Sequence, residues 1–317
     1  MTMPRGIRYA VLAAAVVLLA GVVGWLTAPG TEGLEGEWET AAVGGDVLGG
    51  RALVAGDANV AIDLVTGTRI TLGSVTGGTK AIGGGRLLIL RTSTLDGAGL
   101  DGRSRWTWQG PPAHTLRLVA GSPSTTVVQA CGGTPVSCRL IGVDGNGKES
   151  WQTPQPTATG TGEPVVGEDG SLPSVGVLRT KDGTLVLVDP SSSRITLRTD
   201  TEAAVGRDGV LVLGTTQGGR CRRTTFETID RSTTVTTPGS CAEGNGGLAA
   251  GTAPGVTVRS ARVHSWWWPF GDGRPTLEVS GRHTGRVVGD DPLRALRVDD
   301  AGTTVRNGDV IRRYGYK

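Results

Sequence analysis

The chain has little net charge, few aromatic residues and very few histidines. Its 317 residues carry a formal net charge of +3, and eight tryptophans, three tyrosines and two phenylalanines are its aromatics. So small a net charge does not predict a nucleic-acid partner, because phosphate binding depends on a strongly basic surface. The three histidines, His114, His264 and His283, are too scattered along the chain to nominate a catalytic base.

Common catalytic motifs are also missing. The sequence has no Gly-x-Ser-x-Gly elbow, no phosphate-binding loop and no calcium loop of the Asp-x-Asp-x-Asp-Gly type. The acidic pairs at 290–291 and 299–300 are expected to be solvated turn residues. We therefore predict no catalytic residue, no cofactor-binding residue and no metal ligand, which classes the chain as a non-enzyme.

Glycine is what the sequence has in abundance. There are 53 glycines, and no long stretch shows the spacing of an amphipathic helix. Frequent turns and short apolar runs are typical of an all-β protein.

An apolar run near the N-terminus predicts a membrane segment. Arg5 and Arg8 precede the uncharged residues 9–26, which as a helix would nearly match the hydrocarbon thickness of a bilayer. The arginines favour a cytoplasmic tail at 1–8, an anchor at 9–28, a linker at 29–36 and an extracytoplasmic domain at 37–317 of a single-pass cell-membrane protein. A cleaved signal peptide is the alternative, although Leu26 and Pro29 suit a cleavage site poorly.

Four cysteines follow this run, as expected of a domain outside the cytoplasm. Proximity in the sequence favours the disulfides Cys131–Cys138 and Cys221–Cys241 among three possible pairings. A zinc site is the alternative, but the closely spaced cysteine pairs of such sites are missing.

A strand-turn-strand unit recurs along the chain, most clearly at residues 140–151. Its turn aspartate has counterparts at an interval of about 40 residues, namely Asp63, Asp101, Asp144, Asp189 and Asp230. This interval predicts the four-stranded blades of a β-propeller. A sixth, divergent copy follows, and a seventh blade would combine three C-terminal strands with one N-terminal strand at 36–40. We prefer seven blades, with six or eight as alternatives.

These units resemble the repeats of the pyrroloquinoline-quinone-like propeller superfamily. The resemblance lies in an apolar strand that ends in aspartate, a Thr-Gly or Asn-Gly turn and a following tryptophan, as at Asp63 with Gly67 and at Asp144 with Gly147 and Trp151. It implies that the tryptophans dock between neighbouring blades, namely Trp38, Trp106 or Trp108, and Trp151. The quinone-dependent alcohol dehydrogenases of this superfamily use adjacent paired cysteines and calcium, which have no match here, so the chain is more similar to the non-catalytic scaffold branch.

The resemblance and the membrane run together lead to one functional expectation. The chain is expected to be a membrane-tethered, extracytoplasmic scaffold or binding module whose partner is an envelope or membrane protein, with no cofactor. The alternatives are a ligand sensor that signals through the membrane helix, and a quinone- or metal-dependent oxidoreductase.

The most unusual stretch is rich in aromatics and contains Trp266, Trp267, Trp268 and Phe270, with Pro269 among them. Successive residues of a strand point to opposite faces, so three tryptophans in a row do not all enter one core. We predict an exposed aromatic loop that binds a partner protein, the membrane interface or a glycan. A loop folded onto its own blade is the alternative.

Overall fold

The protein is all-β. The computed structural model describes residues 31–317 except 45, 56–59, 74–76, 157–160, 168, 200, 207, 240, 242–255 and 264–273. The described residues form 27 strands in seven antiparallel sheets, six with four strands and one with three. The predicted all-β class and the preferred seven blades of a β-propeller are confirmed. In this part of the chain, no helix has the length and apolar character needed to span a bilayer, and the anchor predicted at 9–28 lies outside it.

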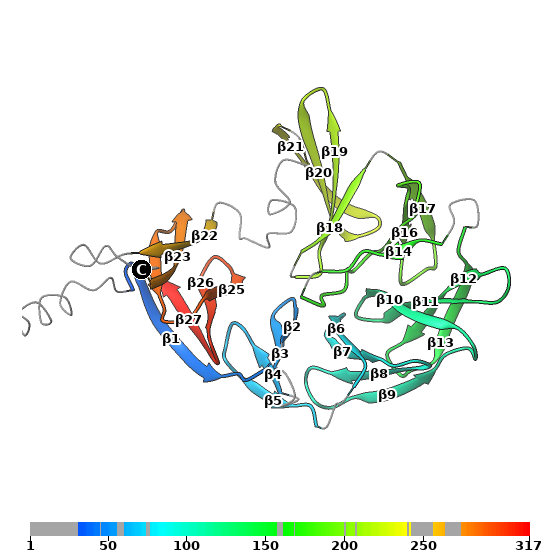
Figure 1. Cartoon of the computed structure of the whole chain (residues 1–317), viewed down its shortest axis with the longest axis horizontal. Coiled ribbons are helices and arrows are strands. Elements are labelled where there is room, and N and C mark those ends of the chain that lie inside the picture. Colours follow the sequence, from blue (N-terminus) through cyan, green and yellow to red (C-terminus); the bar gives the residue numbers. More distant parts are fainter. Residues whose placement is uncertain are drawn as a thin grey trace, which may run out of the picture. The chain divides into compact units, whose positions relative to one another are not determined.

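Five blades form one compact unit, residues 41–251, in which the strands of each sheet follow chain order (Figure 1). Blade 1 contains β2 (Asp46–Gly49), β3 (Ala52–Ala55), β4 (Val60–Asp63) and β5 (Arg69–Thr71). Blade 2 contains β6 (Thr79–Gly83), β7 (Arg86–Leu90), β8 (Thr94–Gly99) and β9 (Arg105–Gln109). Blade 3 contains β10 (Thr115–Gly121), β11 (Thr125–Gly132), β12 (Ser137–Asp144) and β13 (Glu149–Pro154). Blade 4 contains β14 (Glu163–Pro164), β15 (Gly176–Arg179), β16 (Leu185–Val188) and β17 (Ile195–Arg198). Blade 5 contains β18 (Glu202–Val205), β19 (Leu211–Gln217), β20 (Arg220–Thr228) and β21 (Arg231–Pro238).

The second unit, residues 1–40 and 252–317, contains the other two sheets. One holds β22 (Val256–Val263), β23 (Arg274–Gly281) and β24 (Gly285–Val288). The other has the order β1-β27-β26-β25, with β1 (Leu34–Ala41), β25 (Leu293–Val298), β26 (Gly302–Asn307) and β27 (Val310–Tyr316). The predicted seventh blade, completed by an N-terminal strand, is therefore confirmed.

The N-terminal boundary of this blade is a correction. β1 begins at Leu34, inside the linker predicted at 29–36. Leu34 is 6% exposed and packs with Val287 and Val305, so apolar burial extends the strand into a segment whose glycines and glutamates resemble a linker. Trp38 lies in β1 as expected but is only half-buried.

A buried arginine joins the strands of the seventh blade. The side chain of Arg313 in β27 is 2% exposed, and its guanidinium donates to Glu37 Oε2 at 2.8 Å and to Asp299 Oδ1 at 2.8 Å. Burial of Asp299 opposes its ionisation, but hydrogen bonds from Arg313 and Arg297 outweigh that effect and lower its pKa to about 2. The strand from the N-terminal end is thus tied to the C-terminal strands by charge as well as by backbone pairing.

The turn aspartates organise most of the hairpins as predicted. Asp144 Oδ1 accepts the backbone N–H groups of Asn146 and Lys148 at 2.8 and 2.9 Å, and these bonds lower the pKa of its carboxyl. Asp63 and Asp189 cap their turns in the same way. Asp230 differs, because its carboxylate pairs with Arg194 of the preceding blade.

Two tryptophans dock on the next blade, as the resemblance implied. Trp151 of blade 3 donates from Nε1 to the carbonyl of Pro190 in blade 4 at 2.8 Å, and Trp106 of blade 2 packs on Gly147 in blade 3. Each indole lies over a glycine of the neighbouring strand in its own blade: Gly142 pairs with Trp151, and Gly97 with Trp106. A Cβ at either glycine would come within 2.3 Å of the ring.

The segment before β15 crosses the innermost strands of the five-blade unit. Backbone N–H groups of Leu48 and Ile82 donate to the carbonyls of Asp169 and Gly170, both at 2.9 Å. Leu172 donates to the carbonyl of Ile82 at 2.8 Å. We call residues 169–174 the central segment, because its bonds reach β2, β6 and the end of β10.

Candidate binding groove between blades 3 and 4

Neighbouring blades 3 and 4 differ in strand length. β11 and β12 have eight residues each, whereas β15 and β16 have four each. At the inner end, Val119 and Val127 of blade 3 are buried against Leu178 of β15. β15 ends at Arg179, one residue after Leu178, whereas β11 continues to Gly132, so the end of blade 3 reaches beyond the strands of blade 4.

This end of blade 3 forms one wall of a hollow of about 1000 Å³. We call it the blade 3–4 groove. Its walls are β10, β11 and the turn at 133–136 on one side, and residues 161–166 and 179–181 on the other. The volume lies at the upper end of the range of ligand sites. A second, mainly apolar hollow of about 440 Å³ lies beside it, lined partly by Leu172 of the central segment, and shares Arg117, Glu163, Pro164 and Val166 with the groove.

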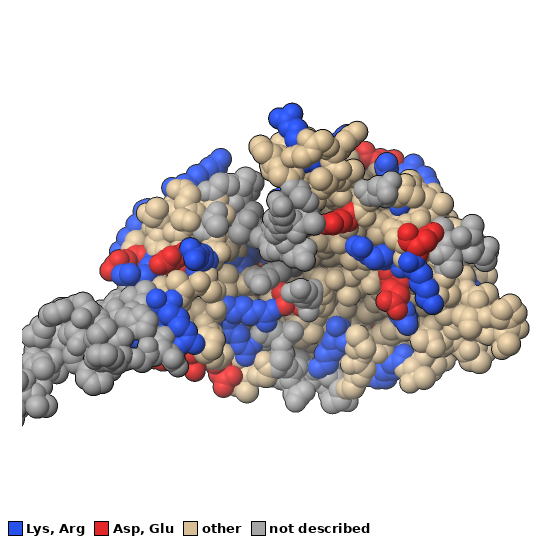
Figure 2. Space-filling view, turned by 45° about the horizontal axis from the view of Figure 1, so that its top comes forward, with Lys and Arg blue, Asp and Glu red and all other residues tan. Residues whose placement is uncertain are grey.

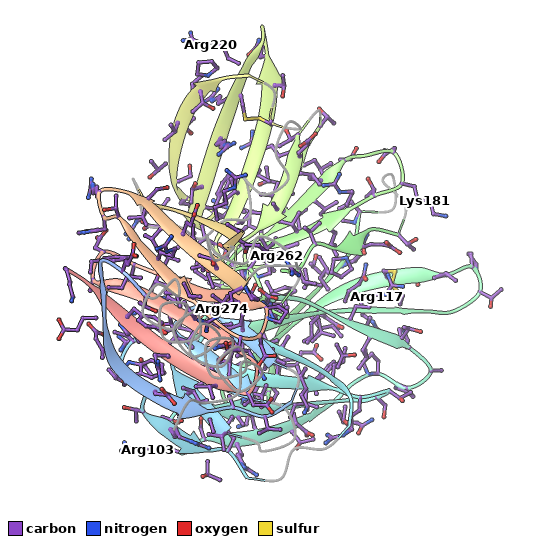
Figure 3. All side chains as sticks on the ribbon, turned by 60° about the vertical axis from the view of Figure 1, so that its left-hand side comes forward. Arg103, Arg117, Lys181, Arg220, Arg262 and Arg274 are labelled. Atoms are coloured by element: carbon purple, nitrogen blue, oxygen red, sulfur yellow. A yellow bond between two sulfur atoms is a disulfide. The ribbon has the colours of Figure 1, made fainter. Side chains whose placement is uncertain are left out.

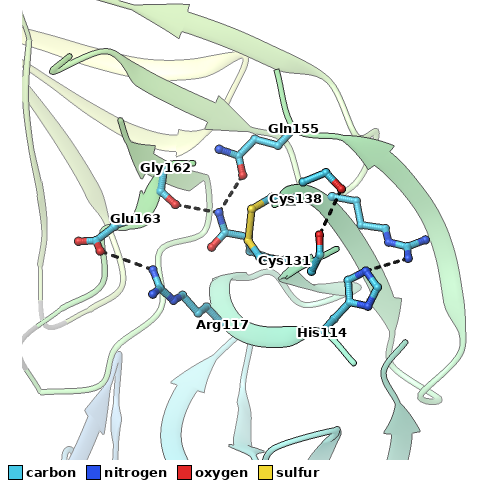
Figure 4. Close-up of a disulfide and its surroundings, with 11 residues drawn as sticks. His114, Arg117, Cys131, Cys138, Gln155, Gly162 and Glu163 are labelled. Atoms are coloured by element: carbon cyan, nitrogen blue, oxygen red, sulfur yellow. Dashed lines mark hydrogen bonds and ion pairs between the residues drawn. A yellow bond between two sulfur atoms is a disulfide. The ribbon is translucent and has the colours of Figure 1, made fainter. Parts of the chain in front are cut away.

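A disulfide closes the projecting end of blade 3. Cys131 and Cys138 are direct partners across β11 and β12 and are bonded, which confirms the first predicted pair. Cys221–Cys241 confirms the second, at the end of blade 5. The first disulfide lies in the wall of the groove near Arg117 and His114 (Figure 4).

Gln129 is a buried amide in the lining of the groove. It is 1% exposed, and its Nε2 donates to Gln155 Oε1 at 2.8 Å and to the carbonyl of Gly162 at 2.7 Å. These two acceptors fix the orientation of the amide. Its Oε1 is then left without a hydrogen-bond partner, an arrangement that costs about 1–3 kcal/mol in a folded protein.

The rim of the groove is polar and mostly basic. Arg117, Arg179 and Lys181 contribute three cationic side chains, all exposed, and Glu163 contributes one carboxylate. Arg117 Nη1 lies 3.6 Å from Glu163 Oε1, and these side chains are 50% and 81% exposed. Figure 3 shows Arg117 and Lys181 on neighbouring blades, and Figure 2 shows basic and acidic side chains next to one another over this part of the unit.

Two aliphatic side chains also face solvent at the groove. Val136, at the tip of the β11–β12 hairpin, is 63% exposed, and Val166 is 43% exposed. The groove thus offers apolar contacts and cations together, a set suited to binding.

Of the residues singled out from the sequence, Cys131 lines the groove, and the others lie elsewhere or outside the described residues. The stretch with Trp266, Trp267, Trp268 and Phe270 is outside them, so its role stays a prediction. His114 Nδ1 contacts the carbonyl of Pro112 and its Nε2 contacts Arg139, while His283 stacks on Tyr316. In the described ranges, no three metal-ligating side chains gather in one place.

Sequence reasoning missed the groove, although one signal for it was present. Gln129 is the single amide in the otherwise apolar or hydroxyl-bearing start of β11, Thr125–Ala130. An amide at a position expected to be buried predicts a polar contact. Arg117, Lys181 and Val136 gave no such signal, because exposed residues of these types are common.

Comparisons with known proteins give no family. No family model matches the chain, and no curated protein matches it. Among solved structures, the WD40 domain of Neurospora crassa Pan2 has a TM-score of 0.41 at 11% identity, covering 87% of this chain and 89% of that one. The β-propeller domain of Cps50 (Swd1) from Myceliophteria thermophila has a TM-score of 0.41 at 12% identity, covering 88% and 100%. The WD40 domain of SCAP from fission yeast has a TM-score of 0.38 at 8% identity, covering 91% and 97%.

Proposed function

We propose that the chain is a membrane-tethered, extracytoplasmic binding or scaffold module of the pyrroloquinoline-quinone-like propeller type, without catalytic activity. Its partner is an envelope or membrane protein, and an extended segment of that partner binds in the blade 3–4 groove. The observation that carries the proposal is the groove itself, whose lining combines exposed Val136 and Val166 with a mostly basic rim. A partner that fills the groove covers both valines.

The proposed location has separate support. Arg5 and Arg8 before the apolar run favour a cytoplasmic N-terminus. Two disulfides suit a compartment outside the cytoplasm. In this arrangement the stretch around Trp266–Trp268 is a second contact point, for the same partner, the membrane interface or a glycan.

The topology has a direct test. Reporter fusions after Thr31 and at Lys317 are expected to be active only when the reporter is one that works outside the cytoplasm. The matched cytoplasmic reporter at the same two positions serves as the control. Cytoplasmic reporter activity at Lys317 would contradict the proposed location while leaving the groove untouched.

The groove has its own test. Purified full-length protein in detergent is exposed to a displayed library of random twelve-residue peptides. The affinity of the retained peptides is then measured for the unsubstituted protein and for variants. Val136→Ser with Val166→Ser is expected to weaken them at least tenfold, because each buried valine contributes about 1–2 kcal/mol. Val235→Ser is the matched control, since Val235 is 57% exposed in β21 and does not line the groove.

The substituted valines are exposed, so thermal unfolding of all these variants is expected to match that of the unsubstituted protein. Peptides that bind equally well to the double variant bind elsewhere. If every retained peptide behaves in that way, the groove is not the binding site.

A further inference from the structure

The chemistry of the blade 3–4 groove restricts what it can bind, if it is the binding site proposed above. Its three cations come from two blades: Arg117 from β10, Arg179 from the end of β15, and Lys181 from the turn that follows. Among the described residues that line the groove, Glu163 supplies the carboxylate. Complementary charge favours a negatively charged partner and excludes a basic one more strongly than it adds affinity.

Glu163 lies where the carboxylate of a partner would be bound. Its Oε1 is 3.6 Å from Arg117 Nη1, beyond ordinary hydrogen-bond distance, and its side chain is 81% exposed. An exposed pair with this geometry stabilises little, about 0–1 kcal/mol. A carboxylate of the partner therefore displaces Glu163 at a small cost in free energy and forms an ion pair with Arg117 in its place.

Gln129 holds the floor of the groove together. Its Nε2 donates to Gln155 Oε1 and to the carbonyl of Gly162, so both acceptors belong to the protein. Its Oε1 is buried as well, so a partner in the groove does not reach it. Gly162 is required for this arrangement, because an added Cβ would lie 2.9 Å from Leu178 Cβ and 3.2 Å from Gln155 Nε2.

Two further features favour a partner peptide that is recognised through its side chains and not through backbone pairing with a strand edge. Pro164 removes one backbone donor from the two-residue strand β14, so this edge is a poor template for an added strand. The described residues that line the groove include no aromatic ring on which a sugar could stack, whereas Val136 and Val166 suit aliphatic side chains.

We infer that the partner segment is an acidic, extended peptide that carries an aliphatic residue. One of its carboxylates replaces Glu163 at Arg117, and its aliphatic side chain covers Val136 and Val166. Arg179 and Lys181 contribute attraction at longer range, so the affinity falls as salt is added.

Charge-altering variants test this assignment with one peptide drawn from the library and its counterpart in which Asp and Glu become Lys. Full-length protein is titrated into each labelled peptide, and binding is followed by fluorescence anisotropy. The acidic peptide is expected to bind at least tenfold more tightly than its lysine counterpart. Glu163→Gln is expected to tighten the acidic peptide threefold to tenfold, since it releases Arg117, and Lys181→Glu to weaken it about tenfold.

Arg103→Glu is the matched control. Arg103 is exposed in the same unit and lies far from Lys181 in Figure 3, and its substitution changes the net charge by the same amount as Lys181→Glu. If Arg103→Glu weakens binding as much as Lys181→Glu does, the effect is one of net charge and the assignment is wrong. Equal affinity for the two peptides, or no gain from Glu163→Gln, also overturns it. If Val136→Ser with Val166→Ser still weakens the peptide in these cases, the groove remains the peptide site and only the preference for acidic peptides is wrong. If the two valine substitutions have no effect either, both the proposed binding site and the acidic preference are wrong.

Discussion

Removing both carboxylates around Arg313 is expected to destabilise the unit that holds β1 and β22–β27 by about 3–5 kcal/mol. The double variant Glu37→Gln with Asp299→Asn keeps the shapes of the side chains but leaves a guanidinium that is 2% exposed without an anion. An uncompensated buried charge costs energy in this range, because burial removes the hydration that would otherwise stabilise it. Hydrogen exchange of the amides in β26 and β27 measures the loss within this unit.

Asp300→Asn is the control, since Asp300 is exposed and adjacent in sequence. It is expected to change stability by less than about 0.5 kcal/mol. Equal protection of β26 and β27 in the double variant and the control would show that Arg313 is held by packing alone. Arg313→Met separates the two cases further, because an apolar residue of similar length removes the charge and its desolvation together.

The same pair gives a pH dependence with a definite sign. The pKa of Asp299 is lowered to about 2 in the folded protein, below the ordinary value of about 3.9 expected after unfolding. Its stabilising contribution is therefore complete above about pH 4 and is lost as the pH falls through about 2. The difference in stability between the unsubstituted protein and Asp299→Asn should shrink over that interval, as measured by denaturant unfolding at pH 7, 4 and 2.5.

Adding a side chain at Gly142 is expected to destabilise blade 3 by about 3 kcal/mol. A Cβ there would lie 2.3 Å from Trp151 Cε2 and Nε1, so the indole must move away and lose its hydrogen bond to Pro190. Overpacking of a filled interior costs about 1–3 kcal/mol, and a lost buried hydrogen bond adds to it. Thermal unfolding of Gly142→Val measures the sum, and Gly36→Val is the control because nothing lies within 4 Å of its added Cβ.

A compensating change sharpens this prediction. Blade 4 has Leu187 and Thr196 as the pair that corresponds to Gly142 and Trp151, while blade 1 has Ala61 and Ile70. Large and small residues are thus exchanged between the two strands at roughly constant volume. Gly142→Leu combined with Trp151→Thr is expected to recover part of the stability lost in Gly142→Leu alone. No recovery would mean that the indole is needed for its contact with blade 4 and not for its volume.

The sequence predicted the repeat because its causes are local. Asp144 specifies its turn through bonds to residues within four positions, and an apolar run such as β16, Leu185–Val188, predicts burial on both faces. Four of the five turn aspartates, Asp63, Asp101, Asp144 and Asp189, accept a backbone N–H of their own turn and therefore mark their hairpins. The seventh blade could also be predicted, since three C-terminal strands without a fourth leave an open edge that the strand at β1 completes.

The disulfides followed from spacing alone, because Cys131 and Cys138 flank a single hairpin and Cys221 and Cys241 flank another strand pair. The blade 3–4 groove could not be predicted from the sequence in this way. The groove exists because blade 4 is shorter than blade 3, a difference visible only once both sheets are placed side by side. Arg117 and Glu163, 46 positions apart, meet there because β10 and β14 are neighbours in space.

By itself, then, the sequence determined the all-β class, the order of the blades, the turns and the two disulfides, since each depends on residues close together in the chain or on one repeated pattern. Tertiary structure alone decided that Arg313 is buried, that the central segment crosses β2 and β6, and that Gln129 is buried beside an open groove. These features depend on contacts between blades, where the partner of a residue is set by packing and not by its distance along the chain.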